Sequence, residues 1–219
     1  IDLPQVIKHN RILMYADDLK IFDRMKTVND CLVLQQDIDS FFAWCEDNSM
    51  DVNVSKCNQI LFFRSLNPLI FQYSIGNENL KICNEVRDLG ILFDTKLSFN
   101  SHIQMITSKA LKTLGYINRL SRELSVGSFK MLYCALVRSI LEYGSVVWNP
   151  QYEVLIYSLE RVQNKFLRSV AFRCGYSREE YTYEELRSRL NIDSLKNRRT
   201  KSDLLFLFRI INGLIDCSE

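Results

Sequence analysis

The chain has 219 residues, of which 47% are hydrophobic and 25% charged, with only 3 Pro and 7 Gly. A chain of this length can bury a hydrophobic core, and its composition excludes a disordered, collagen-like or mucin-like protein. The net charge of +2 is unevenly distributed, because residues 1–97 carry −4 and residues 98–219 carry +6. This asymmetry indicates a cation site beside a surface for polyanions, or else compositional drift.

Two short apolar strands near the N-terminal end predict a β hairpin. Arg11–Tyr15 and Leu19–Asp23 flank Ala16-Asp17-Asp18, so acidic residues are expected at the tip of the hairpin. An amphipathic helix is predicted next, over about residues 28–48, because its apolar residues follow the 3.6-residue period. Thr27 can cap this helix, with Asp30 in the capping-box position.

Three further β segments follow this helix. Asn58–Arg64 is typical of a buried strand, and Val86–Asp94 reads as one more strand. Between them, "IFQYSIGNENLKI" predicts a hairpin that turns at Gly76-Asn77-Glu78-Asn79.

After about residue 96 the apolar residues repeat with a helical period. Helices are predicted over residues 98–122, 126–143 (capped by Ser125), 152–172, 183–190 and 194–212. The expected fold class is therefore α+β, with a mixed part over residues 1–96 and a helical part over residues 97–219.

Seven cysteines are present, and no two of them have the C-x-x-C spacing of a zinc site. An odd number of scattered cysteines argues against a disulfide scaffold and favours a reduced, intracellular compartment, cytoplasm or nucleus. No signal peptide and no apolar run of membrane-spanning length is visible, so no membrane partner is expected.

The adjacent carboxylates of Asp17 and Asp18 are the strongest chemical signal. Two ionised carboxylates a few ångströms apart repel by roughly 1–4 kcal/mol, and a bound divalent cation removes this repulsion. Oxygen ligands without Cys or His select Mg²⁺, or Mn²⁺, and such ions stabilise the oxygens of a phosphoryl displacement. The alternative is a solvated turn, because Asp favours turns for local reasons.

Several motifs, in the same order, resemble the reverse transcriptases of non-LTR retrotransposons. "YADD" at Tyr15–Asp18 resembles their catalytic hairpin, and "IDLP" at Ile1–Pro4 resembles the segment that precedes it. "WCEDNSMDVNVSKC" at Trp44–Cys57 is similar to a palm segment, and "VRDLGILFD" is similar to the primer-grip hairpin. The later "LVRSILEYGSVVWNP" and "LERVQNKFLR" resemble thumb-side helices. The resemblance covers essentially the whole chain.

This resemblance implies a fold, partners and roles. Residues 1–96 would form an incomplete polymerase palm, and residues 97–219 a helical thumb with a C-terminal extension. An RNA template, a DNA primer and a dNTP would be the partners, and Mg²⁺ (or Mn²⁺) the cofactor. Asp17 and Asp18 would be catalytic metal ligands. The other implied site residues are Tyr15 and Ala16 near the primer end and the nucleotide, Lys56 as a charge-neutralising group or proton donor, and Leu89 and Gly90 in the primer grip.

Plainer interpretations of two of these residues stay open. Lys56 could be an ordinary solvated lysine that follows a turn. Gly90 could let the backbone approach nucleic acid closely, or could be the glycine of a strand bulge.

Cations repeat with helical spacing in the second half of the chain. Arg161, Lys165 and Arg168 form one stripe, and Lys109, Lys112 and Arg119 form another. Such stripes suit a nucleic-acid phosphate backbone, although a solvated helix face has the same pattern. "KNRRTK" at residues 196–201 could also be read as a nuclear-import patch or as a short cationic loop.

The motifs of a complete polymerase are not all present. These enzymes need a further metal-binding Asp from an earlier palm strand and a nucleotide-binding fingers domain, and no segment before Tyr15 reads as that strand. The chain is therefore expected to be a fragment of an RNA-directed DNA polymerase that does not polymerise alone. The alternatives are a catalytically dead nucleic-acid-binding or interaction module, and a helical scaffold with an incidental hairpin.

Overall fold

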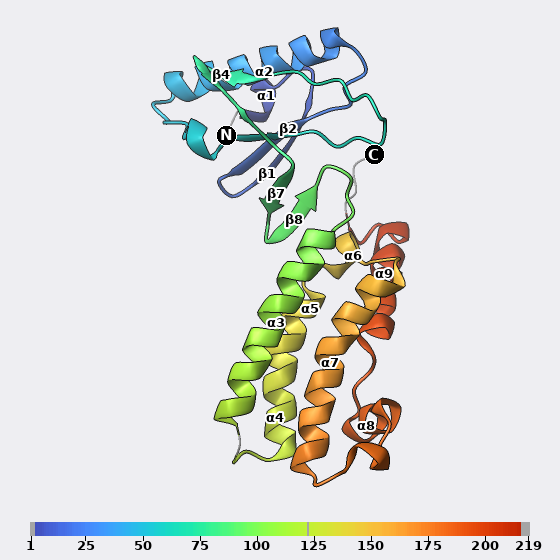
Figure 1. The fold of residues 1–219 in the computed structure, drawn as a ribbon. Coiled ribbons are helices and arrows are strands. Elements are labelled where there is room, and N and C mark those ends of the chain that lie inside the picture. Colours follow the sequence, from blue (N-terminus) through green and yellow to red (C-terminus); the bar gives the residue numbers. More distant parts are fainter. Residues whose placement is uncertain (1–2, 122, 216–219) are drawn as a thin grey trace. The chain divides into compact units, whose positions relative to one another are not determined.

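The computed structural model describes residues 3–121 and 123–215, so that Ile1 and Asp2 of the "IDLP" motif lie outside the described residues. The chain folds as two compact units, Ile1–Ser98 and Phe99–Glu219. The first combines helices with small β sheets, and the described residues of the second form helices and their connections (Figure 1). The α+β class predicted from the sequence is confirmed.

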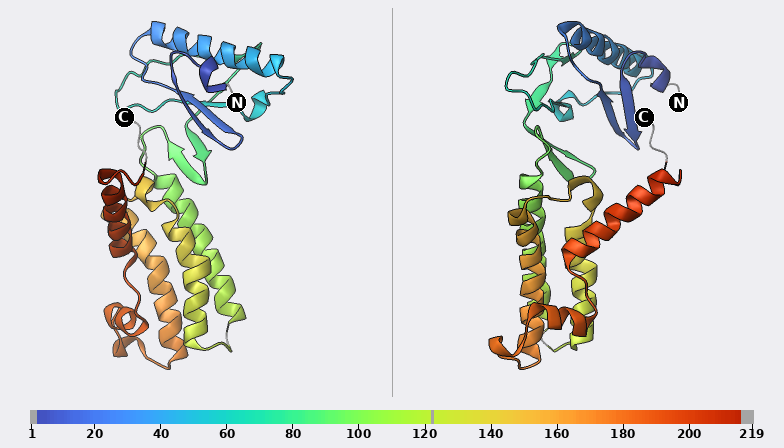
Figure 2. Two further views of the ribbon diagram at one scale, coloured as in Figure 1. Left: turned by 180° about the vertical axis from the view of Figure 1, so that it is seen from behind. Right: turned by 90° about the vertical axis from the view of Figure 1, so that its right-hand side faces the viewer.

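The described residues of the first unit, 3–98, form two α-helices and four two-stranded sheets. Helix α1 spans Leu3–Val6 and helix α2 spans Val28–Asp47. The antiparallel pairs are β1 (Arg11–Tyr15) with β2 (Asp18–Phe22), β4 (Ser74–Ile75) with β5 (Glu78–Asn79), and β7 (Glu85–Asp88) with β8 (Ile91–Asp94). Strand β3 (Asn58–Ile60) pairs in parallel with β6 (Lys81–Cys83). Helix α2 runs along one side of this unit in every view (Figures 1 and 2).

Helix α2 forms where the sequence predicts it and carries much of the core of the first unit. The Thr27 side chain accepts a hydrogen bond from the Asp30 N–H, and the Asp30 carboxylate accepts one from the Thr27 N–H, which confirms the capping box. The buried face of α2 contributes Cys31, Leu34 and Ile38, which pack in one cluster with Tyr73 and Ile75 of the following β region.

Two predicted strands differ from the structure. Val86–Asp94 is not one strand: β7 and β8 pair antiparallel and turn at Leu89-Gly90, whose φ angles are +43° and +88°. Two-residue hairpin loops favour positive φ, so Gly90 is a turn glycine and the strand-bulge interpretation is wrong. Asn58–Arg64 is not a buried strand either, because only Asn58–Ile60 pair with another strand, and these residues are half-buried or exposed.

The second unit is built from long helices. Helix α3 spans Asn100–Leu120 and α7 spans Glu153–Arg173, and the two pack against each other. Between them, α4 (Val126–Leu132) continues through a π-helical segment (Tyr133–Arg138) into α5 (Ser139–Glu142), and α6 (Ser145–Trp148) follows. Helices α8 (Tyr183–Leu190) and α9 (Leu195–Ile211) complete the unit. The predicted helices are confirmed within a few residues, except that the one expected over residues 126–143 is not regular throughout.

A polar contact lies inside the core of the second unit. The Tyr133 hydroxyl donates to Gln163 Oε1 at 3.0 Å, and the Tyr133 ring stacks on Phe166 with a centroid distance of 4.0 Å. Both Tyr133 and Gln163 are fully buried. Since a buried polar group without a partner is costly, this bond fixes how the π-helical segment sits on α7.

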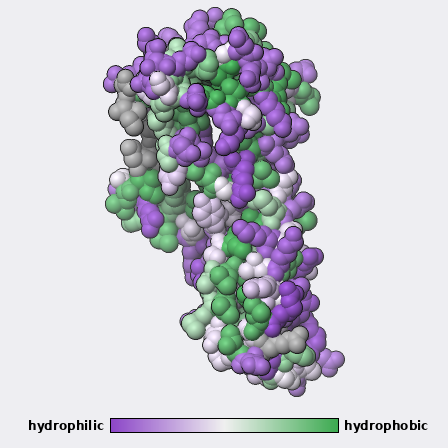
Figure 3. All heavy atoms as spheres, turned by 90° about the vertical axis from the view of Figure 1, so that its left-hand side faces the viewer, coloured by the Kyte–Doolittle hydropathy of each residue, from purple (hydrophilic) through white to green (hydrophobic). Residues whose placement is uncertain are grey.

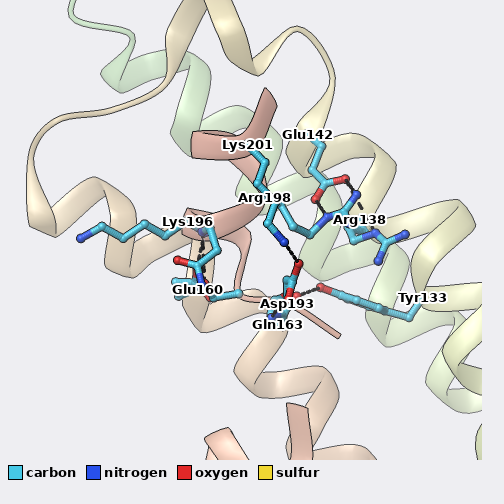
Figure 4. A network of polar contacts seen from close by, with 11 residues as sticks. Tyr133, Arg138, Glu142, Glu160, Gln163, Asp193, Lys196, Arg198 and Lys201 are labelled. Atoms are coloured by element: carbon cyan, nitrogen blue, oxygen red, sulfur yellow. Dashed lines mark hydrogen bonds and ion pairs between the residues drawn. The ribbon is translucent and has the colours of Figure 1, made fainter. Parts of the chain in front are cut away.

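Three cations at the start of α9 pair with carboxylates of the same unit (Figure 4). Arg198 makes a two-bond contact with Glu142, and Lys201 Nζ lies 2.6 Å from Asp193 Oδ2. The Lys196 ammonium lies 3.1 Å from Glu153 Oε1. These cations lie on a helix, so "KNRRTK" is not a cationic loop.

The C-terminal half of α9 has a different surface. Its apolar side chains are largely exposed, and Figure 3 shows hydrophobic residues gathered on the end of α9 that projects from the second unit; they are Leu204, Leu205, Leu207, Phe208 and Ile211. Among residues 3–121 and 123–215, no helix combines the length and the hydropathy needed to cross a bilayer.

Candidate functional site

The predicted catalytic hairpin is present as β1 and β2. Tyr15 pairs with Asp18, so Ala16 and Asp17 form a two-residue loop and Asp18 is the first residue of β2. Ala16 has a φ of +54°, a left-handed conformation that costs a residue with a Cβ roughly 1–2 kcal/mol. Backbone strain of this kind clusters at functional sites in proteins.

The carboxylates of Asp17 and Asp18 are exposed. Neither makes a hydrogen bond or an ion pair with the part of the chain that the structure describes, so their oxygens are available to a ligand from solvent. Tyr15, which is 67% exposed, precedes them on the same hairpin. Within the described ranges, no group of three or more His, Cys, Asp and Glu side chains could hold a metal ion. The hairpin thus offers two exposed carboxylates with hard oxygen donors, which suit a partly hydrated Mg²⁺ better than a metal enclosed by protein ligands.

Asp37 holds the segment that leads into this hairpin, and the sequence reasoning missed it. It is 2% exposed, and its Oδ2 atom accepts hydrogen bonds from the His9 N–H, the Asn10 N–H and the Asn10 side-chain amide, at 3.0, 2.9 and 2.8 Å. Its Oδ1 atom accepts a further bond from the Lys8 N–H at 3.2 Å. One carboxylate on α2 therefore fixes the backbone just before β1.

Hydrogen bonding also decides the charge state of this carboxylate. Burial alone raises the pKa of Asp37, but the Asn10 amide and the backbone N–H groups of Lys8, His9 and Asn10 lower it by more. The net pKa lies below its usual value of 3.8, so the group is ionised at neutral pH. A sequence signal did exist, since Asp37 stands between Leu34 and Ile38 on the apolar face of α2.

The Leu89-Gly90 turn is tied to the candidate hairpin by an ion pair. Lys20 of β2 lies 2.6 Å from Asp88 Oδ2 at the end of β7, directly before the turn. Leu89 is 44% exposed at the tip of this second hairpin. The structure therefore links the elements that carry Asp18 and Gly90, which the sequence placed in one site.

Lys56 lies on a segment outside the two hairpins. It ends a 3₁₀ helix, Val54–Lys56, and is exposed, while the neighbouring Val54 and Cys57 pack against the core cluster of α2. No hydrogen bond or ion pair joins its ammonium to Asp17 or Asp18. Its predicted role in the reaction stays a prediction.

Both predicted basic stripes lie on the solvent side of long helices. The basic stripe of α3 is Lys109, Lys112 and Arg119, and the basic stripe of α7 is Arg161, Lys165 and Arg168. All six residues are exposed, and none forms an ion pair with a carboxylate of residues 3–121 or 123–215. Their role in nucleic-acid binding stays a prediction as well.

Comparison with known proteins identifies relatives of the chain. It is 25% identical to the RNA-directed DNA polymerase from mobile element jockey of Drosophila melanogaster, over 85% of this chain and 21% of that protein. It is 22% identical to the probable RNA-directed DNA polymerase from transposon X-element of the same species, over 91% of this chain and 23% of that protein. An uncharacterized protein of Caenorhabditis elegans is 31% identical, over 60% of this chain and 66% of that protein.

The chain spans about a fifth of the length of the polymerases that it matches. No protein-family model and no solved structure matches it. The similarity to several polymerases nevertheless extends over most of the chain. The chain is therefore a distant relative of the RNA-directed DNA polymerases of non-LTR mobile elements.

Proposed function

We propose that the chain is the palm-end and thumb part of an RNA-directed DNA polymerase, with the β1–β2 hairpin at its catalytic site. The reaction is attack of a primer 3′-hydroxyl on the α-phosphate of a dNTP, directed by an RNA or DNA template, with pyrophosphate as the leaving group. The supporting observation is that Asp17 and Asp18 stand free of partners at a strained hairpin tip, in a relative of such polymerases.

The residues of the hairpin fit the expected cofactor. Asp17 and Asp18 would hold Mg²⁺, or Mn²⁺, since both supply hard oxygen donors and neither forms an ion pair with a described cation of the chain. The bound ion would stabilise charge on the attacking and leaving oxygens. Tyr15 and Ala16 would position the primer end and the nucleotide, and Leu89 and Gly90 would support the primer from the linked turn. Lys56 would neutralise charge near the leaving group.

The chain by itself is expected to be inactive. Two carboxylates give an incomplete coordination sphere, and the described residues offer no third ligand close enough to complete a protein cluster. Polymerase activity would then need the remaining ligands and the nucleotide-binding fingers of a longer protein. Its working compartment would be the cytoplasm or the nucleus, where a template is present.

Metal binding tests the site directly. Paramagnetic Mn²⁺ should broaden the NMR signals of the Tyr15–Leu19 amides selectively, and Asp17→Asn with Asp18→Asn should abolish this effect. Asp23→Asn is the matched control, because Asp23 is an exposed acid just beyond β2. Broadening that is absent in the wild type, or unchanged in the double variant, contradicts the proposed site.

Primer extension tests the expected inactivity. The purified chain, with Mg²⁺, dNTPs and a primed RNA template, should incorporate no nucleotide. Templated incorporation that Asp17→Asn removes would show that the chain alone is a polymerase, and would contradict only this part of the proposal.

A second candidate function is a non-catalytic nucleic-acid-binding module. The unpaired basic stripes of α3 and α7 favour it, because cations that the fold does not neutralise remain available to phosphates. Experiments can separate the polymerase from the binding module. A binding module should bind nucleic acid with unchanged affinity after Asp17→Asn and Asp18→Asn. It should also show no selective broadening of the hairpin amides by Mn²⁺.

A further inference from the structure

The solvent face of α7 carries more than cations. Tyr157, Arg161, Lys165, Arg168 and Phe172 follow one another at intervals of three or four residues, which places them along one side of the helix. The opposite side is buried in the unit through Leu159, Val162, Phe166 and Val170. Packing therefore fixes the first set toward solvent, along the length of α7.

The charge on this face is uncompensated. The basic stripe of α7 has no ion-pair partner in residues 3–121 and 123–215, and no carboxylate stands between Tyr157 and Phe172 on this side. Three cations of α9 differ, because Glu142, Glu153 and Asp193 neutralise Arg198, Lys196 and Lys201. The fold thus pairs these three cations internally, while the basic stripe of α7 stays available to an external polyanion.

An aromatic residue stands at each end of the basic stripe. Tyr157 is 66% exposed and Phe172 is 85% exposed, and the two are 15 positions apart, or about 22 Å along the helix. No other ring of the described residues stacks on either. Exposed aromatic rings are the groups on which proteins stack unpaired bases, whatever the sequence.

The combination of cations and aromatic rings distinguishes single-stranded from double-stranded nucleic acid. A duplex presents phosphates to the cations, but its bases are stacked on one another and give no face to Tyr157 or Phe172. A single strand presents both phosphates and free base faces. The aromatic groups therefore add to the affinity for a single strand alone.

We propose that this face of α7 binds single-stranded nucleic acid, with phosphates along Arg161, Lys165 and Arg168 and bases stacked on Tyr157 and Phe172. The inference deepens the proposed nucleic-acid function and rests on it. The shared chemistry is an unpaired sugar–phosphate strand, from either RNA or DNA.

The test is fluorescence anisotropy with the full chain and labelled 20-nucleotide single strands of RNA and of DNA, beside a 20-base-pair duplex. Tyr157→Ala with Phe172→Ala should weaken single-strand binding about tenfold or more and leave duplex binding unchanged. Arg161→Gln, Lys165→Gln and Arg168→Gln together should weaken binding to both, and should reduce the single-strand salt slope by about 2.

Two controls make the result specific. Tyr152→Ala removes an equally exposed tyrosine at the N-cap of α7, outside this face, and should change nothing. Tyr157→Phe with Phe172→Tyr keeps an aromatic ring at both positions and should therefore retain the single-strand affinity of the wild type. Circular dichroism checks that each variant keeps its helices.

The outcomes distinguish the two levels of the proposal. If the aromatic double variant weakens single strands and duplex equally, or weakens neither, the stacking role is wrong while nucleic-acid binding stands. If the wild-type chain binds neither single strands nor the duplex at low salt, both the stacking role and the proposed nucleic-acid function are wrong. A larger effect of the double variant on the RNA strand or on the DNA strand identifies the preferred ligand.

Discussion

The Lys20 ammonium lies 2.6 Å from Asp88 Oδ2, and this ion pair joins the β1–β2 hairpin to the β7–β8 hairpin. The two sheets are otherwise separate two-stranded pairs, and isolated pairs of this size are only marginally stable. The pair therefore contributes to the relative placement of Asp17 and Asp18 and of the Leu89-Gly90 turn.

A double-mutant cycle measures this contact. Lys20→Met and Asp88→Asn should show a coupling energy of about 0.2–1 kcal/mol, because both side chains are partly exposed and water screens their attraction. Urea unfolding of the first unit can be followed through Trp44, with a Trp44→Phe variant giving the background from Trp148 in the second unit. The coupling energy should shrink in 0.5 M NaCl, and a coupling energy of zero at low salt would show that the ion pair contributes nothing to stability.

Loss of the Asp37 carboxylate should destabilise the first unit. Asp37→Asn keeps the shape of the side chain but removes the charged acceptor of four hydrogen bonds, so the free energy of unfolding should fall by about 2–3 kcal/mol. Asp39→Asn is the matched control, because Asp39 is an exposed acid on the same helix, and it should change stability by about 0.5 kcal/mol or less. Equal effects of the two variants would mean that Asp37 does not anchor the segment before β1.

The pH dependence of stability provides a separate test of Asp37. Its pKa in the folded chain lies below the unfolded value, so its contribution is complete above the unfolded pKa and is lost as the pH falls through the folded pKa. The stability difference between the wild type and Asp37→Asn should therefore be constant near neutral pH and narrow below about pH 4. Urea midpoints of both proteins between pH 7 and pH 3 measure this stability difference. A difference that widens in acid would contradict a lowered pKa of Asp37 in the folded chain.

The strained turn at Ala16 predicts an order among substitutions. Ala16→Val should lower the free energy of unfolding by ~1 kcal/mol or more relative to Ala16→Gly, because a β-branched residue is strongly disfavoured at a φ of +54° and glycine is not. Hydrogen exchange of the β1 and β2 amides gives the local readout. If valine and glycine are tolerated equally, the turn has a different backbone conformation in solution.

Local signals account for what the sequence predicted well. Thr27 and Asp30 mark the start of α2 because a capping box needs only residues three apart, and Ser125 marks the start of α4 for the same kind of reason. The acidic pair and the family resemblance predict the tip of the β1–β2 hairpin. The availability of the two carboxylates was not predictable, since it depends on which cations the fold places elsewhere.

Long-range pairing accounts for what the sequence did not show. Leu89 looks like a strand residue, and its left-handed backbone is visible only once β7 and β8 pair. The partners of Asp37 are mainly backbone N–H groups about 28 residues away, and backbone groups leave no mark in a sequence. The stacking of Tyr133, in the π-helical segment after α4, on Phe166 of α7 likewise joins residues that are far apart in the sequence.

The ion pairs at the start of α9 bear on the interpretation of "KNRRTK" as a nuclear-import patch. An import receptor that reads "KNRRTK" as an extended peptide must first unwind the opening turns of α9 and displace Glu142, Glu153 and Asp193 from their arginine and lysine partners. While α9 is formed, the second unit therefore does not present this stretch as an extended peptide.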